Sequence, residues 1–327
     1  MISSEWVFDD TNSEEAIAYD MYTHVAPKAS SNVGVDILER MAIYDKDHCW
    51  QYDIRLNNAK TDLEESGFTE EYIKTLRTGD FEYKIVTDKK ERSELTKFIY
   101  KHEWLASLSQ YTTHWFGAYH KGILAGVILM NMPNAFSKLL GDDTKHIERL
   151  ISRGACISWS PKNLASNFLM WCMKYMAHNT QYRLFTCYSD PTAKEKGSIY
   201  QALNMYYIGQ NSGTTKRYIN PYTGRLVSDR VFRARSFYKI YAKELNIKWE
   251  KNWSSDQSML WENVPKAVED KLRERSKEVQ ASATYHTFPS KHKYVFILGK
   301  DNSETKFLRK KFLSMNKIYP YPTERGK

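Results

Sequence analysis

Apolar and polar residues alternate in a regular way from Phe81 onward. The segment FEYKIVT (81–87) predicts a strand. Asp88 then occupies an N-cap position before a stretch with apolar residues at helical spacing, which predicts an amphipathic helix over residues 89–107. Residues 114–133 predict two strands joined at His120-Lys121-Gly122, because glycine supplies the positive φ of a tight hairpin.

The same order of strand, connection and helix recurs further along. The predicted elements are a strand at 154–160, a loop at 161–166, a largely apolar helix at 167–179, a strand at 183–190, a short helix at 197–203 and a strand at 205–210. Asn204 is expected to end the short helix in the left-handed conformation. A hairpin around residues 217–234 and a strand at 293–299 follow. This order predicts a mixed α/β fold.

Charge divides the chain unequally. Residues 1–80 hold 7 basic and 17 acidic residues, whereas the remainder holds 41 basic and 22 acidic. We therefore predict an acidic N-terminal extension (1–80), a catalytic core (81–213) and a basic, aromatic-rich C-terminal part (214–327) that completes the core and contacts DNA. The basic remainder favours a polyanionic partner. The acidic extension is interpreted either as a mimic of nucleic acid covering the binding face or as a solvated cap.

Composition argues against several classes of protein. The longest apolar runs, such as 123–132, are too short to cross a bilayer, so no membrane partner is expected. The acidic N-terminus lacks the features of a secretory signal, which predicts a cytoplasmic location. Cys49, Cys156, Cys172 and Cys187 are widely spaced and lack His partners at zinc-finger spacing. We expect buried thiols and neither a disulfide framework nor a structural zinc site, and we assign no metal ligands. The sequence leaves metal dependence open, because distant residues can converge in a fold.

The order of elements from Phe81 to Gln210 resembles that of the GNAT acyltransferase superfamily. This resemblance implies a mixed, mostly antiparallel central sheet flanked by helices. The segment 160–166 (SPKNLAS) lacks the glycine-rich cofactor motif of that superfamily. The identity of the donor is therefore left open.

Several short segments, in their order, resemble the phage Mom family of DNA adenine-modification proteins. They are ERLISRG (148–154), SPKNLAS (160–166), YSDP (188–191), GSIYQA (197–202), PSKHKYVFILG (289–299) and YPYP (319–322). The resemblance implies a transferase that adds a carbamoylmethyl or acyl-type group to the N6 amine of adenine in duplex DNA and so protects the DNA from restriction. If the protein is encoded by a phage, it would act in the host cytoplasm.

Five residues are candidates for catalysis. Tyr200 lies where the GNAT resemblance implies a residue facing the leaving group, and a phenol can donate a proton to it. Asp190 ends a strand, where open α/β sheets place ligands, and could orient or deprotonate an amine; it could equally begin a turn. Arg149 could clamp an anion, Ser158 could line the acceptor pocket, and His102 is a weaker candidate for proton transfer.

Cofactor binding is assigned to a helix N-terminus, where backbone N–H groups meet phosphates. Lys162, Asn163 and Ser166 precede or open the helix at 167–179. Gly197 is added from the Mom-like segment. The donor is unknown; a phosphate-bearing acyl donor fits, such as a coenzyme A thioester or an aminoacyl-tRNA. The alternative for Asn163 and Ser166 is ordinary helix capping.

DNA binding is assigned to the basic segment after the core. Its candidate residues are Lys216, Arg217, Arg230, Arg233 and Arg235. Aromatic residues lie between them and could support an extruded base, although a half-buried hairpin shows the same alternation. Residues 286–327 hold 10 basic and 3 acidic residues, which suggests a second contact with the DNA backbone.

Two other functions remain open at this point. One is a GNAT N-acyltransferase acting on an amine of tRNA, protein or a pre-modified DNA base. The other is a DNA-binding protein without catalytic activity on a GNAT-like fold. The sequence does not indicate the oligomeric state, the modified base or the DNA target.

Overall fold

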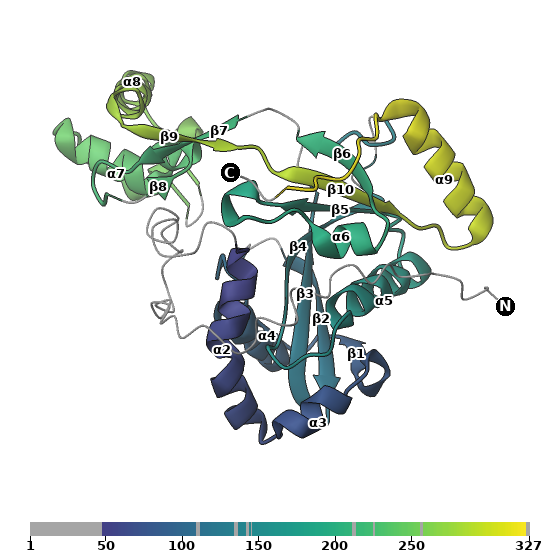
Figure 1. Ribbon diagram of the computed structural model, residues 1–327. Helices are drawn as coiled ribbons and strands as arrows, with labels where there is room; N and C mark the ends of the chain where they lie inside the picture. Colours follow the sequence, from purple (N-terminus) through teal and green to yellow (C-terminus); the bar gives the residue numbers. More distant parts are fainter. Residues whose placement is uncertain are drawn as a thin grey trace. The chain divides into compact units, whose positions relative to one another are not determined.

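A computed structural model describes residues 48–108, 112–133, 137–141, 144, 146–210, 214–224, 226–255 and 258–324 (Figure 1). The chain forms two compact units. The core unit contains the described residues up to 210 together with 291–324, and the insert unit contains 214–290. Residues 214–327, predicted as one part, are thus divided between the two units.

The core unit consists of one sheet and helices on both of its faces. Its strands are β1 (Glu82–Ile85), β2 (Thr112–His120), β3 (Ile123–Asn131), β4 (Glu148–Cys156), β5 (Leu184–Ser189), β6 (Tyr206–Gln210) and β10 (His292–Ile297). Its helices are α2 (Trp50–Ser66), α3 (Glu70–Thr75), α4 (Lys89–His102), α5 (Leu164–Asn179), α6 (Ser198–Ala202) and α9 (Asn302–Met315).

The strand order in this sheet is β1-β2-β3-β4-β5-β10-β6. Every neighbouring pair is antiparallel apart from β4 and β5, which are parallel. The predicted mixed, mostly antiparallel, GNAT-like fold is therefore confirmed. Strand β10 comes late in the sequence, yet it lies between β5 and β6, so the C-terminal part of the chain completes the core sheet.

Alternation along the strands builds a core on each face of the sheet. Ile128 and Met130 of β3 pack in the cluster that contains α5, whereas Val127 and Leu129 pack in the cluster that contains α4. At the other end of the sheet, Val295 and Ile297 of β10 pack with Leu308 and Phe312 of α9. Their neighbours Tyr294 and Phe296 pack on the α5 side. This period of two is the expected behaviour of a sheet covered on both faces.

The described part of the predicted N-terminal extension packs on the core. Trp50 of α2 is 2% exposed and its ring lies edge-on to Trp104, with 5.3 Å between centroids. Arg55 donates hydrogen bonds to the carbonyls of Ser158 and Ser160 at 2.9 and 2.7 Å. Residues 48–80 thus support the core, while residues 1–47, with most of the acidic extension, lie outside the described residues.

The insert unit consists of a small sheet and two helices. The sheet has the order β8-β7-β9, with β7 (Thr214–Ile219), β8 (Leu226–Val227) and β9 (Tyr285–Pro289). Helices α7 (Arg235–Glu244) and α8 (Lys266–Ser282) pack through a buried aromatic and aliphatic cluster. The predicted strand at 225–234 is reduced to two residues, because Phe232 turns into this cluster within a 3-10 turn at Asp229–Arg233.

The structure confirms three local predictions, one at a helix N-cap, one at a hairpin and one at the end of a helix. The carboxylate of Asp88 accepts from the backbone N–H of Glu91 at 2.9 Å, so the predicted N-cap is confirmed. Lys121 and Gly122 join β2 to β3 with φ values of 49° and 78°. Asn204 has the expected left-handed conformation, with φ 51°.

One strand differs from its prediction. The strand predicted at 154–160 begins six residues earlier, as β4, and ends at Cys156. Ile157 still donates its backbone N–H to the Ala125 carbonyl of β3 at 2.8 Å, and the chain then leads into the loop before α5. Among the described helices, none has both the length and the apolar character that a membrane crossing requires.

Candidate functional site

Parallel strands β4 and β5 separate part-way along the sheet. Their pairing joins Glu148–Leu150 to Leu184–Thr186, and no later residues of the two strands pair with each other in the described structure. The remaining part of β4 pairs with β3, and the remaining part of β5 pairs with β10. This divergence is the splayed strand arrangement that a GNAT-like mechanism requires.

The segment that follows α4 connects the two separating strands. On the β4 side, Arg153 donates from Nε to the Ser107 carbonyl at 2.8 Å and from Nη2 to the Ser107 hydroxyl at 3.0 Å. On the β5 side, Trp104 donates from Nε1 to Oε1 of Glu195 at 2.9 Å. Residues 103–108 therefore lie between the ends of β4 and β5.

Asp190 lies at the carboxyl end of β5, inside a network of polar groups. Its backbone N–H donates to Oε2 of Glu195 at 2.9 Å, and its side chain accepts from the backbone N–H of Thr192 at 3.0 Å. Lys291 places Nζ 3.1 Å from Oδ2 of Asp190. Asp190 thus begins a turn, as the alternative interpretation held, and its side chain is only 10% exposed.

The carboxylates of this network differ from ordinary surface carboxylates. Burial raises the pKa of Glu195 to about 7, helped by the nearby charges of Glu103 and Asp190. Burial also raises the pKa of Glu103, against the influence of Arg153. The pKa of Tyr200 is raised well above its ordinary value by burial and by neighbouring carboxylates, which keeps its phenol protonated. The phenol therefore keeps its proton to give to a leaving group, although its raised pKa makes it a weaker acid than an ordinary tyrosine.

Helix α6, which carries Tyr200, is held by β10 and by the C-terminal segment. Tyr294 packs against Tyr200, with 5.3 Å between ring centroids, and its hydroxyl donates to the Lys196 carbonyl at 2.5 Å. Tyr321 donates to the Met205 carbonyl at 2.8 Å. The side chain of Gln201 donates to the Pro322 carbonyl at 3.3 Å. Segments far apart in the sequence therefore fix the position of the phenol.

Gly197, directly before α6, has a backbone conformation and a close contact with Tyr294 that only glycine allows. Its φ is 76°, and a β-carbon there would lie 2.6 Å from the ring of Tyr294. Only glycine fits this close approach in this conformation. Its predicted role in cofactor binding stays a prediction.

The N-terminus of α5 carries the other three residues predicted to bind the cofactor. Asn163 adopts a left-handed conformation, with φ 69°, and its side chain makes no capping bond to the helix. The Ser166 hydroxyl donates to the Asn163 carbonyl at 3.1 Å, so it does not accept from the helix N–H groups in that bond. The first turn thus lacks a side-chain cap among the described residues, and Lys162 stands directly before it.

His102 and Ser158 meet at a different carboxylate. The backbone N–H of Ser158 donates to Oδ2 of Asp62 at 3.1 Å, and Nδ1 of His102 lies 3.6 Å from the same oxygen. Burial lowers the pKa of His102 to about 4. The structure thus brings these two candidates together at Asp62 of α2, and His102 directly precedes Glu103 of the Asp190 network.

Arg149 lies at the beginning of β4, before the two strands separate. Its guanidinium carbon is 3.5 Å from the ring centroid of Tyr182, and it donates hydrogen bonds to the Tyr182 hydroxyl and the Glu148 carbonyl. Because β4 and β5 are parallel, this end of β4 is opposite to the end where β5 carries Asp190. Arg153, further along β4, contacts the network instead.

The residues predicted to bind DNA all belong to the insert unit. Lys216 lies over the ring of Tyr285 at 4.2 Å, and Arg230 is exposed. Arg233 pairs with Asp229 at 2.5 Å, and Arg235 donates to the Ser255 carbonyl at 2.7 Å. Arg217 is half-buried on β7.

Most aromatic rings between these basic residues are unavailable to an extruded base. Phe232, Phe237 and Tyr238 are at most 5% exposed, because they form the core of the insert unit. Within this stretch, Tyr218 is half-buried and Tyr222, at 39% exposure, is accessible. The alternation of aromatic and basic residues therefore reflects packing at these three positions.

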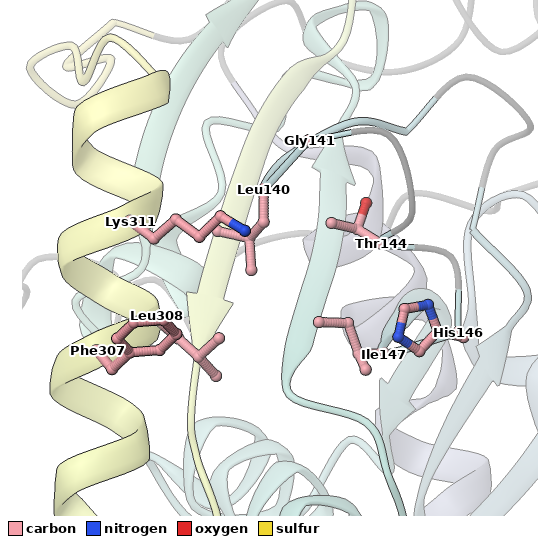
Figure 2. A pocket seen from close by; sticks show the side chains of 8 residues that line it. All are labelled: Leu140, Gly141, Thr144, His146, Ile147, Phe307, Leu308 and Lys311. Carbon is pink, nitrogen blue, oxygen red and sulfur yellow. The ribbon is translucent and has the colours of Figure 1, made fainter.

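A cavity of about 500 Å³ lies between α9 and the residues Leu140, Gly141, Thr144, His146 and Ile147 (Figure 2). Figure 2 shows Phe307, Leu308 and Lys311 of α9 on one side and Ile147 with His146 on the other. None of the predicted site residues lines this cavity. In the described part of the chain, no group of three or more His, Cys, Asp or Glu side chains is arranged to hold a metal ion.

The prediction from sequence missed three members of the Asp190 network. They are Glu103, Glu195 and Lys291, which come from three distant segments. A signal was present for Lys291, since PSKHK belongs to a Mom-like segment. Glu103 and Glu195 carry no local signal, because only burial beside another carboxylate distinguishes them from surface residues.

Comparison with solved structures finds acetyltransferases and a decarboxylase. An N-acetyltransferase from Staphylococcus aureus Mu50 has 13% identity and a TM-score of 0.31, covering 45% of this chain and 92% of that one. A probable acetyltransferase from Staphylococcus epidermidis ATCC 12228 has 11% identity and a TM-score of 0.30, covering 42% and 87%. Malonyl-CoA decarboxylase from Rhodopseudomonas palustris has 10% identity and a TM-score of 0.31, covering 84% and 70%. These TM-scores are low, so the fold assignment rests on the strand order and pairing.

Comparison by sequence gives a clearer result. No curated protein matches the chain. The model of the Mom protein family matches residues 80–322, which include β1 and continue through α9 and the C-terminal YPYP segment. The chain is a member of the Mom protein family.

Proposed function

We propose that the protein is a DNA base-modifying transferase that adds a carbamoylmethyl or acyl-type group to the N6 amine of adenine in duplex DNA. The observation that carries the proposal is the network around Asp190 at the separation of β4 and β5, with the protonated phenol of Tyr200 nearby. Membership of the Mom family supports group transfer to DNA as the class of reaction.

The chemistry assigns one proton transfer to each of two residues. The N6 amine is a weak nucleophile, because its lone pair is delocalised into the ring. Asp190 accepts a proton from N6 as the new N–C bond forms. Tyr200 donates its proton to the leaving group as the bond between the donor and the transferred carbon breaks. Glu195 positions both residues, since it binds the Asp190 backbone and stands before α6.

The N-terminus of α5 fits a phosphate-bearing donor. Its first turn has no side-chain cap among the described residues, and Lys162 adds a positive charge beside it. A bound coenzyme A thioester or aminoacyl-tRNA would supply the electrophilic carbon. Lys162, Asn163 and Ser166 would hold its phosphates, and the basic residues of the insert unit would contact the DNA backbone.

The test is mass spectrometry of nucleosides from the DNA of cells that express the chain. A new modified adenosine is expected with the wild-type protein and is expected to be lost with Tyr200→Phe and Asp190→Asn. Tyr100→Phe is the matched control, since Tyr100 is an exposed phenol on α4. A different altered base would contradict the adenine assignment. An unchanged nucleoside profile with retained DNA affinity would indicate a DNA-binding protein without this activity.

A further inference from the structure

One face of the core sheet changes from apolar to polar along its length. The register aligns Leu184 with Ile297, Thr186 with Val295 and Tyr188 with Lys293 across β5 and β10. Opposed residues of an antiparallel pair share a face. Helix α9 covers the apolar pairs on this face. The polar continuation with Tyr188 and Lys293 runs toward the ion pair of Asp190 and Lys291.

Lys293 is a largely buried lysine. The residue is 7% exposed and, among the described residues, its ammonium makes neither a hydrogen bond nor an ion pair, while Nζ itself keeps some contact with solvent. Nζ lies 5.7 Å from the ring centroid of Tyr188. Burial lowers the pKa of Lys293, although the charge of Glu148 acts in the opposite direction. Its N–H groups are therefore available to a ligand that enters this part of the sheet.

We propose that Lys293 recognises the target base, by donating a hydrogen bond to a ring nitrogen adjacent to N6 of the extruded adenine. The inference rests on the proposed function, and it identifies Lys293 as the side chain that recognises the target base. Adenine presents a donor at N6 beside the acceptors N1 and N7. Asp190 as acceptor and Lys293 as donor match this pattern, whereas guanine presents an acceptor at the position of N6.

The burial of Lys293 favours a base over a backbone phosphate. Phosphates of duplex DNA remain hydrated and are contacted by exposed lysines and arginines. A side chain that is 7% exposed is suited to a group that leaves solvent itself. An extruded base does so, and the ring of Tyr188 offers it an aromatic neighbour.

The test measures binding, because binding does not require the donor. Duplexes carry adenine, 1-deazaadenine or 7-deazaadenine opposite an abasic site, where extrusion is easier, and fluorescence anisotropy gives each affinity. Wild-type protein is expected to bind one of the two deaza duplexes about tenfold more weakly than the adenine duplex. Lys293→Met is expected to bind all three with the same reduced affinity. Lys300→Met, a change at an exposed lysine after β10, is the matched control and should discriminate as wild type does.

A thermal unfolding measurement separates recognition from a structural role. Lys293→Met removes a buried charge, so its midpoint is expected to equal or exceed that of wild type. A lowered midpoint together with unchanged discrimination between the duplexes would assign Lys293 to structure and overturn the proposal.

The wild-type protein alone provides an independent check. Equal affinity for all three duplexes would overturn the proposal even if Lys293→Met fails to fold. Failure to bind any duplex would refute the proposed function as well. Strong binding without discrimination would leave the DNA function intact and refute only the role of Lys293.

Discussion

Trp104 donates its indole N–H to Glu195, with 2.9 Å between Nε1 and Oε1. The bond joins the end of α4 to the segment between β5 and α6, and it lies beside the candidate catalytic Asp190. Trp104→Phe is expected to lower the free energy of unfolding by about 1–3 kcal/mol, because a buried carboxylate loses a donor. Denaturant unfolding measures this change. Trp171→Phe, a half-buried indole without a described hydrogen bond, should have a smaller effect.

Glu195 should make the stability depend on pH. Burial raises its pKa from 4.5 to about 7, so between these values the folded protein holds a proton that the unfolded chain has lost. The free energy of unfolding therefore falls as pH rises through this interval, by about 3 kcal/mol from this group. Glu195→Gln is expected to remove this fall. Parallel pH curves for the two proteins, measured by urea unfolding, would refute the raised pKa.

Gly197 should be sensitive to an added methyl group. A β-carbon there would lie 2.6 Å from the ring of Tyr294, and the backbone has φ 76°. Gly122 has φ 78° with open space around it, so it is the matched control. Both alanine variants carry backbone strain of about 1 kcal/mol or more. Gly197→Ala is expected to lose about 1–3 kcal/mol more. Equal losses would show that the contact with Tyr294 is unimportant.

The C-terminal segment should affect modification through α6. Tyr321→Phe removes the hydrogen bond to the Met205 carbonyl, at the end of the helix that carries Tyr200. We expect the free energy of unfolding to fall by about 1 kcal/mol. We also expect a lower yield of modified nucleoside, because Tyr200 would be held less firmly. Tyr319→Phe is the control, since the described contacts of Tyr319 involve its backbone and its ring. The same yield from both variants would argue against positioning by the Tyr321 hydroxyl.

Two arginines of the insert unit should differ in DNA binding. Arg230 is exposed and has no ion pair among the described side chains, whereas Arg233 pairs with Asp229 at 2.5 Å. If Arg230 neutralises one phosphate, Arg230→Ala lowers the slope of log affinity against log salt by about 0.9. Arg233→Ala should lower it less, because its charge is already partly compensated. Titrations at several salt concentrations measure both slopes, and an unaltered slope for Arg230→Ala would exclude this contact.

Much of the fold followed from local sequence signals. The N-cap at Asp88, the hairpin at Gly122 and the end of α6 at Asn204 depend on the conformational preferences of single residues. The pattern of apolar runs bounded by turn residues similarly identified most strands of the core sheet. It failed at residues 225–234, because the burial of Phe232 in a separate cluster depends on α7 and α8.

The candidate site was predicted only in part. Asp190 and Tyr200 fall in Mom-like segments, and the structure places both in one region. The sequence predicts a role for Arg149, yet it is Arg153, further along β4, that contacts the segment between the separating strands. Which arginine lies near the site depends on where β4 and β5 stop pairing, and local composition does not encode this.

The sequence by itself determined the order of elements, the basic charge of the chain after residue 80 and the resemblance to the Mom family. Only the tertiary structure decided that Glu103, Glu195 and Lys291 lie near Asp190, and that Lys293 is largely buried with no hydrogen bond or ion pair among the described residues. The physical reason is that a pKa and an unsatisfied hydrogen bond are properties of surroundings. Those surroundings are made here by strands and loops that are distant in the chain and adjacent in the sheet.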